Sequence, residues 1–229
     1  MLILALDSAT VACSAALWRD GHVLAHRFAA MERGQAEALL PMVRDVMADA
    51  GQGYDALDHL AVTVGPGAFT GLRIGLSAAR GLALAAGVPL GGVTTLEAVA
   101  EGVSLTGLEG RVLVVVLGTK RSDLYVQAFD AARQAIAEPA VLPPEALPGW
   151  APDSRLLLAG DGAQVALEPL ADAGWEAAVS DAPGLPDAAL VASLAAARLS
   201  AGVGLRVPEP LYLTPPMATI PRAGGRLRP

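Results

Sequence analysis

Residues 60–76 read LAVTVGPGAFTGLRIGL, an apolar run that passes through glycines into a segment rich in small residues. The first part, 60–65, is apolar and β-branched, which is typical of a buried strand. Residues 70–86 are rich in Gly, Ala and Leu and predict a helix. A buried strand that leads directly into a helix indicates an α/β fold.

The chain before this unit predicts three consecutive strands. Residues 2–7, 11–18 and 22–28 are short and mainly apolar. An Asp-Gly pair between the last two predicts a tight turn, because it supplies the positive φ that such turns need. Apolar residues then recur at helical spacing over 34–50, which predicts an amphipathic helix.

The same order of elements returns in the second half. Residues 111–117, 124–129 and 135–141 predict three further strands. We therefore expect two duplicated α/β lobes, each a mixed sheet with helices, at residues 1–107 and 108–229.

The rest of the second half is less regular. Residues 139–153 contain five prolines and predict a loop. Residues 155–159 predict a strand, and residues 187–201 predict an alanine-rich helix.

Composition excludes several classes of protein. The chain has 229 residues, of which 53% are hydrophobic, so it can bury a core. Its formal net charge of −7 argues against a protein that binds nucleic acid alone through a basic surface. The single cysteine, the absence of a basic leader and the lack of a long apolar run predict a soluble, cytoplasmic protein with no membrane contact.

The glycine turn has two interpretations. Gly65 and Gly67 allow backbone angles that other residues rarely adopt, and Thr70 is placed to cap the following helix. A strand, a glycine turn and a helix N-terminus can bind an anion. However, no Lys-Ser/Thr pair follows, as a P-loop requires, and the spacing does not fit a dinucleotide fingerprint. An anion site and a purely structural turn both remain open.

The helix after the turn carries small residues on one face, including Gly71, Gly75 and Ala79. Glycine inside a helix costs roughly 1 kcal/mol relative to alanine. Its presence at this spacing therefore indicates close approach of another backbone. That backbone belongs either to this chain's own sheet or to another subunit.

Other polar residues give no catalytic or metal site. His22 and His26 share a face of a strand but lie roughly 13 Å apart at about 3.3 Å per residue, so they cannot bind one ion. Cys13 falls in a predicted buried strand, where a thiol is usually inert. We found no serine in a nucleophile elbow.

Four segments resemble the TsaB (YeaZ) family: ILALDSATVACSAAL (3–17), LLPMV (39–43), GPGAFTGLRIGL (65–76) and PLYL (210–213). The run from Gly67 to Arg73 is highly specific for that family. The family is similar to the glycoprotease-like branch of the actin/Hsp70/sugar-kinase superfamily. The resemblance therefore implies two actin-like (ribonuclease H-like) lobes.

The resemblance also implies an accessory role in the threonylcarbamoyl modification of adenosine 37 of tRNA. The catalytic paralogue of the family, TsaD, binds metal with a His-x-x-x-His pair. The matching positions here are Thr95 and Val99, and a valine cannot bind metal. The resemblance thus implies a subunit without catalytic residues, metal or cofactor.

Partners follow from the same resemblance. TsaB-like proteins pair with TsaD through two helices of the first lobe, and the ATPase TsaE joins the assembly. The same surface can form homodimers, and tRNA is contacted only indirectly. On this chain the two helices are 34–50 and 70–86. The residues expected at the interface are Leu39, Leu40, Val43, Met47, Gly71, Arg73, Ile74, Gly75 and Ala78.

Asp7, Ser8 and Thr10 lie between the first two predicted strands. In actin-like folds this hairpin carries an acid and a glycine-rich turn that meet phosphate and magnesium. Here the Cβ of Ala9 hinders close approach of a ligand to the backbone. A phosphate-binding role and a structural role for Asp7 both remain open.

Three positions depart from the common pattern of the family: Gln35, Gly118 and Thr214. Two other functions are weighed against the accessory role. One is an ATP- and Mg²⁺-dependent phosphotransferase that uses Asp7 and Thr10, and the other is a metallopeptidase.

Overall fold

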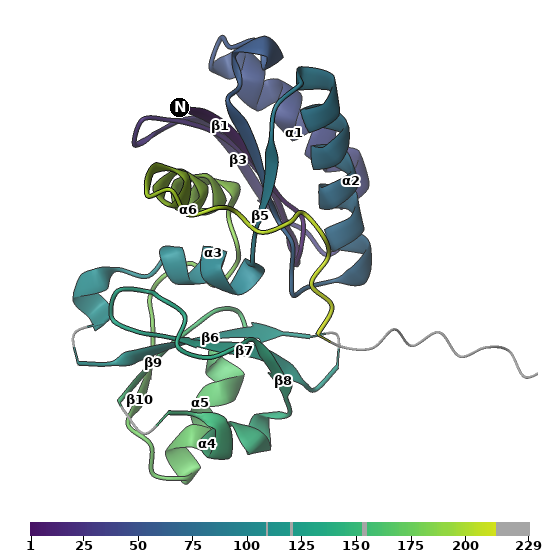
Figure 1. The fold of residues 1–229 in the computed structure, drawn as a ribbon. Helices are drawn as coiled ribbons and strands as arrows, with labels where there is room; N and C mark the ends of the chain where they lie inside the picture. The colour runs from purple at the N-terminus through teal and green to yellow at the C-terminus, as the bar shows by residue number, and fades with distance from the viewer. Residues whose placement is uncertain (109, 120, 153–154, 214–229) are drawn as a thin grey trace, which may run out of the picture.

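The computed structural model describes residues 1–108, 110–119, 121–152 and 155–213, which form two lobes, each built on one sheet (Figure 1). The first sheet has strand order β3-β2-β1-β4-β5. Its strands are β1 (Leu2–Asp7), β2 (Ala12–Arg19), β3 (His22–Ala30), β4 (His59–Thr63) and β5 (Leu90–Val93). β1, β2 and β3 pair antiparallel, whereas β4 is parallel to β1 and β5 is parallel to β4.

The second sheet repeats this topology. Its order is β10-β9-β6-β7-β8, which is the order of the first sheet read from the other edge. The strands are β6 (Val112–Gly118), β7 (Leu124–Phe129), β8 (Ala140–Leu142), β9 (Leu156–Ala159) and β10 (Ala177–Val179). β6 pairs antiparallel with β7 and parallel with β9. The predicted pair of duplicated α/β lobes is confirmed.

Each sheet is covered by helices on both faces. Helices α1 (Gln35–Asp49) and α2 (Phe69–Ala86) pack on one face of the first sheet. In the second lobe, α5 (Ala163–Asp172) and the short α4 (Leu147–Trp150) lie on one side, and α3 (Thr95–Glu101) lies on the other.

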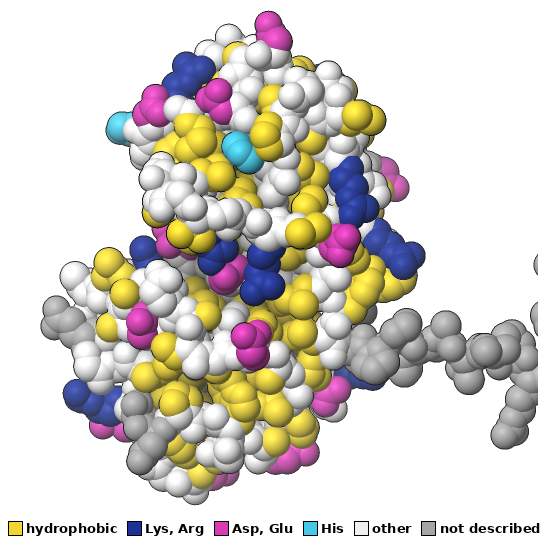
Figure 2. Space-filling view, in the orientation of Figure 1, with side chains coloured by type: hydrophobic (Ala, Val, Ile, Leu, Met, Phe, Trp, Pro, Cys, Tyr) yellow, Lys and Arg dark blue, Asp and Glu magenta, His cyan; other side chains and the backbone are white. Residues whose placement is uncertain are grey.

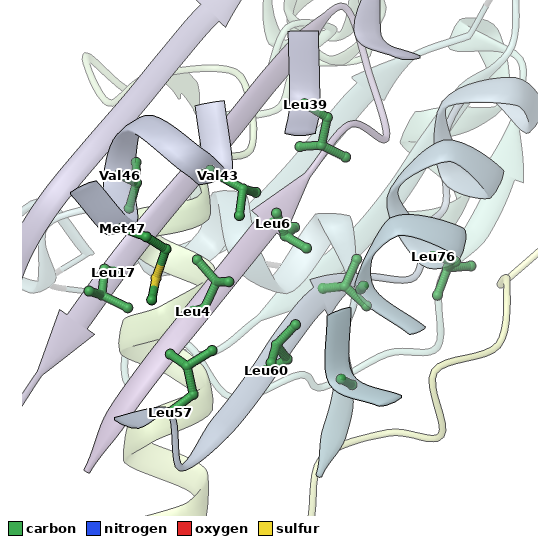
Figure 3. Close-up of a cluster of buried hydrophobic side chains, with 14 of the residues drawn as sticks. Leu4, Leu6, Leu17, Leu39, Val43, Val46, Met47, Leu57, Leu60 and Leu76 are labelled. Atoms are coloured by element: carbon green, nitrogen blue, oxygen red, sulfur yellow. The ribbon is translucent and has the colours of Figure 1, made fainter. Parts of the chain in front are cut away.

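The side chains of β1 alternate between two cores. Leu4 and Leu6 point toward α1 and α2 (Figure 3), whereas Ile3 and Ala5 face the opposite side of the sheet. All four are fully buried. Because β1 is covered on both faces, its sequence is a continuous apolar run rather than an alternating one.

The opposite face of the first sheet is covered by α6 (Ala188–Ser200), although this helix follows the second sheet in the chain. Asp187 caps α6 by accepting a hydrogen bond from the Ala189 N–H (2.8 Å). Its carboxylate also lies 2.8 Å from His26 Nε2 on β3. The Ala188 N–H donates to Ser14 Oγ on β2 (2.9 Å).

Charged side chains of both signs gather at the waist between the lobes (Figure 2). Glu97 on α3 forms an ion pair with Arg198 on α6 (2.6 Å). Glu101 pairs with Arg133 from the β7–β8 loop (3.2 Å), and Arg133 also donates to the Glu101 carbonyl (2.7 Å). These contacts link α3 to both lobes.

Helix α2 lies unusually close to the turn between β1 and β2. A Cβ on Gly71 would meet the Ser8 carbonyl oxygen at 2.1 Å, and one on Gly75 would meet Ser8 Oγ at 2.8 Å. Ser8 Oγ donates to the Gly71 carbonyl (2.9 Å). The small residues of α2 therefore make room for this chain's own sheet, which resolves the alternative left open by the sequence.

Several local expectations were wrong. The residue at the N-cap of α2 is Ala68, not Thr70, and no side chain caps this helix. The predicted loop at 139–153 contains β8 and α4, and α5 and β10 have no counterpart in the sequence prediction. No helix within the described residues is long and apolar enough to cross a bilayer.

The close approach of α2 is testable by paired glycine substitutions. Gly71→Ala should destabilise the fold by about 2 kcal/mol or more, because the added methyl overlaps backbone that cannot move cheaply. Gly81→Ala in the same helix meets nothing within 4 Å and should stabilise by up to about 1 kcal/mol. Urea unfolding measures both, and equal stability of the two variants would refute the tight contact.

Candidate functional site: the interlobe cleft and the outer face of helices α1 and α2

A cavity of about 900 Å³ lies between the lobes. From the first lobe it is lined by the β1–β2 turn, the start of α1 and the glycine turn before α2. From the second lobe it is lined by the β6–β7 turn and by Asp161, which follows β9. Residues 211–213 close part of its rim.

Two helix N-termini reach this cavity. Gly34 and Gln35 line it at the start of α1, and Ala68 and Phe69 line it at the start of α2. Neither helix has a side-chain cap. The first N–H groups of both helices therefore have no capping side chain, an arrangement that favours negative charge nearby.

The three polar residues of the first hairpin are not brought together at the cavity. Thr10 is the one of the three that lines it among the described residues, and its Oγ1 is buried with no hydrogen-bond partner there. Ser8 is turned toward α2 and donates to the Gly71 carbonyl. Asp7 is fully buried.

Asp7 occupies an interior polar position. Its Oδ1 accepts hydrogen bonds from Thr63 Oγ1 (2.5 Å) and from the Ala9 N–H (3.2 Å), while Oδ2 has no partner within the described chain. Burial raises the pKa of Asp7 to about 7, although the bonds from Thr63 and Ala9 lower it, and the charge of Asp187 raises it further. Asp7 therefore keeps its proton to a higher pH than an exposed aspartate does.

The wall from the second lobe contains a further acid. Asp161 Oδ1 accepts a hydrogen bond from the Gly118 N–H (2.8 Å), and burial raises its pKa. Gly118 is one of the three departures from the family pattern. Sequence reasoning did not single out Asp161, because it lies 43 residues beyond its partner and no motif links the two.

The other two positions that depart from the family pattern are Gln35 and Thr214. Gln35 Nε2 donates to the carbonyls of Thr10 (3.3 Å) and Met31 (3.1 Å) and so ties the start of α1 to the first hairpin. Thr214 lies outside the described residues.

No group of three or more His, Cys, Asp or Glu side chains in the described ranges is arranged to hold a metal ion. His26 pairs with Asp187, whereas His22 Nδ1 lies near the Asp20 carbonyl (3.1 Å). Cys13 is buried, and burial raises the pKa of its thiol to about 11. This thiol is therefore protonated and a weak nucleophile at neutral pH.

The residues expected at a partner interface divide into two groups. Leu39, Val43 and Met47 are buried in the core between α1 and the sheet, so their side chains do not lie at the surface of this chain. Gly71 and Gly75 are likewise buried, against the β1–β2 turn.

The second group remains at the surface. Leu40 is 52% exposed, and Arg73 is also exposed. Ile74 and Ala78 are half-buried. These four residues define what we call the helix-pair surface, and α1 and α2 lie side by side beneath it (Figure 1).

Arg73 belongs to a cluster that the sequence did not reveal. Its guanidinium carbon lies 3.7 Å from the centre of the Phe69 ring, and its Nε donates to the Tyr212 hydroxyl (3.2 Å). Tyr212 stacks on Phe69 with ring centres 5.3 Å apart. Tyr212 falls in the PLYL segment, but nothing local indicates its partner 139 residues earlier.

The raised pKa of Asp7 gives a pH-dependent prediction. For an acid whose pKa is higher in the folded state, stability is lost as pH rises between the unfolded and folded values, here from about 4 to about 7. Asp7→Asn removes this loss and retains the Oδ1 acceptor. Its stability relative to wild type should therefore increase over that range by on the order of 1 kcal/mol per pH unit.

Thermal unfolding from pH 4 to 8 measures this difference. Asp55→Asn, which removes an exposed carboxylate, serves as the control for the loss of one acidic side chain. A difference between Asp7→Asn and wild type that stays constant with pH would contradict the raised pKa.

Comparisons with known proteins place the chain in a family. A family model described as TsaD, tRNA N6-adenosine threonylcarbamoyltransferase, matches residues 23–174. The Escherichia coli (strain K12) tRNA threonylcarbamoyladenosine biosynthesis protein TsaB is 46% identical over 116 residues, covering 51% of this chain and 50% of that protein. An uncharacterized Mycobacterium leprae protein, ML0378, is 36% identical over 79% of this chain and 51% of its own length. The chain spans about half the length of the curated relatives it matches.

Solved structures agree over nearly the whole chain. YeaZ from Pseudomonas aeruginosa is 30% identical, with a TM-score of 0.78 over 93% of this chain and 99% of that one. The activator of the 2-hydroxyisocaproyl-CoA dehydratase from Clostridium difficile has a TM-score of 0.52 at 12% identity over 90% of this chain and all of its own, so it shares the two-lobed actin-like fold alone. The chain therefore belongs to the TsaB (YeaZ) family, within the wider group matched by the TsaD family model.

Proposed function

We propose that this protein is a non-catalytic accessory subunit of threonylcarbamoyladenosine biosynthesis. In this role it binds the TsaD paralogue through the helix-pair surface, and TsaE joins the assembly. The protein thereby supports the transfer of a threonylcarbamoyl group to adenosine 37 of tRNA. The pathway is supported by the similarity to the E. coli tRNA threonylcarbamoyladenosine biosynthesis protein TsaB. The observation that carries the docking role is an apolar surface on two adjacent helices whose inner faces already belong to the core.

The helix-pair surface is suited to docking. Leu40 is a large apolar side chain that is more than half exposed, and Ile74 and Ala78 are only half-buried. The core beneath them fixes both helices, because Leu39, Val43 and Leu76 pack against the sheet. A stable complex buries about 800 Å² on each partner, which two helices of this length can supply.

The residue types at the position of the TsaD metal pair support a non-catalytic role. Thr95 and Val99 are both completely buried within α3. Val99 has no ligand atom, and it packs in the core between α3 and the second sheet. A metallopeptidase or metal-dependent transferase at this position would need ligands that these side chains do not supply.

The acidic net charge of the chain supports the proposal that it contacts tRNA only indirectly. Phosphate contacts require clustered Lys and Arg, whereas this chain has 23 Asp and Glu against 16 Lys and Arg. We assign the main tRNA surface to the partner for this reason.

The interlobe cavity favours one rival, a nucleotide-dependent phosphotransferase. Two helix N-termini line this cavity and favour an anion. However, the acid that would hold Mg²⁺, Asp7, is fully buried and is not among the described residues that line this cavity. Calorimetry with ATP and Mg²⁺ separates the two functions, because tight binding with turnover by the isolated protein would support the rival.

The accessory role is tested by reconstitution with the cognate TsaD and TsaE. Omission of this protein should reduce tRNA threonylcarbamoylation to background. Unchanged modification without it would refute the proposal.

The docking surface is tested by Leu40→Glu. A buried unpaired charge at the centre of an interface should weaken binding to TsaD by at least about 30-fold, because hot-spot losses of about 2 kcal/mol are typical there. Val165→Glu on α5 is the matched control, since Val165 is 54% exposed and Leu40 is 52% exposed. Size-exclusion chromatography and binding isotherms read out both variants, and equal affinity would place the interface elsewhere.

A further inference from the structure

The segment after α6 crosses from the back of the first sheet to the mouth of the cleft. We call residues 205–213 the strap. Arg206 forms an antiparallel bridge with Gly92 on β5, with N–O distances of 2.8 and 3.1 Å. Further along, the Leu211 N–H donates to the Val64 carbonyl (2.7 Å). Figure 1 shows this segment in yellow, passing across β5 toward the foot of α2.

Glycines provide the space in which the strap lies. A Cβ on Gly91 would meet Leu205 Cβ at 2.4 Å, and a Cβ on Gly65 would meet the Leu211 carbonyl oxygen at 2.8 Å. A Cβ on Gly92 would lie 3.3 Å from the Arg206 carbonyl oxygen. The strap is therefore a fixed part of the first lobe that also covers the edge of β5.

Two arginines of α2 hold the strap from the other side. Arg80 Nη2 donates to the Pro208 carbonyl (2.6 Å). Arg73 contacts both the Phe69 ring and the Tyr212 hydroxyl, and the two rings stack on each other. The guanidinium group and the two aromatic rings therefore form one stack. Each side chain of this stack is positioned before any partner arrives.

Both rings of the stack are partly exposed and line the rim of the interlobe cavity. Phe69 is 48% exposed and Tyr212 is 40% exposed. Leu84, on the same stripe of α2, is 85% exposed, and Val207 on the strap is 70% exposed. Arg73, a residue of the helix-pair surface, contacts this row through the Phe69 ring and the Tyr212 hydroxyl.

The strap and the adjoining stripe of α2 carry three arginines, Arg73, Arg80 and Arg206, against one exposed acid, Glu209, although the chain carries a net charge of −7. Neither Arg73 nor Arg80 forms an ion pair with a carboxylate among the described residues. Within the described part of the chain, both cations therefore lack a carboxylate partner.

We propose that the strap and α2 together form a second half of the docking surface, with the Phe69–Arg73–Tyr212 stack at its centre, and that it binds an apolar, acidic face of the partner. This proposal rests on the proposed function, which makes that partner the TsaD paralogue. Tyrosine and arginine are enriched at binding hot spots, and a stack that is already ordered loses little side-chain entropy on binding.

The test measures the affinity of the full-length chain for TsaD. Tyr212→Ala should weaken binding by about tenfold or more, because it removes the ring and frees Arg73. Tyr54→Ala is the matched control, since Tyr54 is 39% exposed, and it should change affinity by less than about twofold. Tyr212→Phe keeps the ring and loses only the hydroxyl, so its loss of affinity should lie between those of Tyr212→Ala and Tyr54→Ala.

A second measurement tests the charge. Binding of wild type should weaken as salt rises, and Arg80→Gln should lower the association rate and reduce this salt dependence. If Tyr212→Ala fails to fold, Tyr212→Phe and Arg80→Gln carry the test, and wild-type behaviour of both would overturn the proposal.

The outcomes separate this inference from the proposed function. If Leu40→Glu abolishes binding and Tyr212→Ala matches Tyr54→Ala, the strap surface is refuted and the helix-pair surface stands. Tighter binding by Tyr212→Ala would mean that the strap masks the partner site, which also overturns the proposal. If wild type does not bind TsaD at all, both fail together.

Discussion

The close approach of α2 to the β1–β2 turn is the contact on which the first lobe depends. Gly71 and Gly75 bring the helix within reach of Ser8, and Ser8 Oγ binds the Gly71 carbonyl across the gap. This contact sets the distance between α2 and the strands β1 and β4 that it covers. It also fixes the start of α2 beside Ala9, whose carbonyl accepts from the Ala68 N–H (2.7 Å). The position of α2 therefore determines both the first-lobe wall of the cleft and the orientation of the helix-pair surface.

The elements of the first lobe were predictable because their signals are local. Helix α1 shows a 3.6-residue apolar period, and the β2–β3 hairpin turns at Asp20 and Gly21, both of which have positive φ. The duplicated lobe was predictable because β6 and β7 repeat the pattern of β1 and β2. By contrast, α4 forms within a proline-rich stretch whose composition is typical of a loop. Packing against α5 provides the stability that its own sequence does not.

The site was predictable only where position along the chain implies position in space. The apolar period of α1 correctly selected Leu39, Val43 and Met47 as one face, but that face lies against the sheet. Periodicity identifies a buried face without saying what buries it. The stack of Phe69 and Tyr212 and the pair of Gly118 and Asp161 depend on contacts between distant segments. No propensity or spacing rule in a single sequence indicates such contacts.

The return of α6 to the first sheet has a consequence for how the protein is made. One face of that sheet, including Ile3 and Ala5, is covered mainly by α6, a helix that lies beyond the whole second sheet in the chain. While the ribosome is still producing the second lobe, this apolar face is open to water and to other nascent chains. Completion of the core on this face of the first lobe therefore waits for α6, which is made after the second sheet.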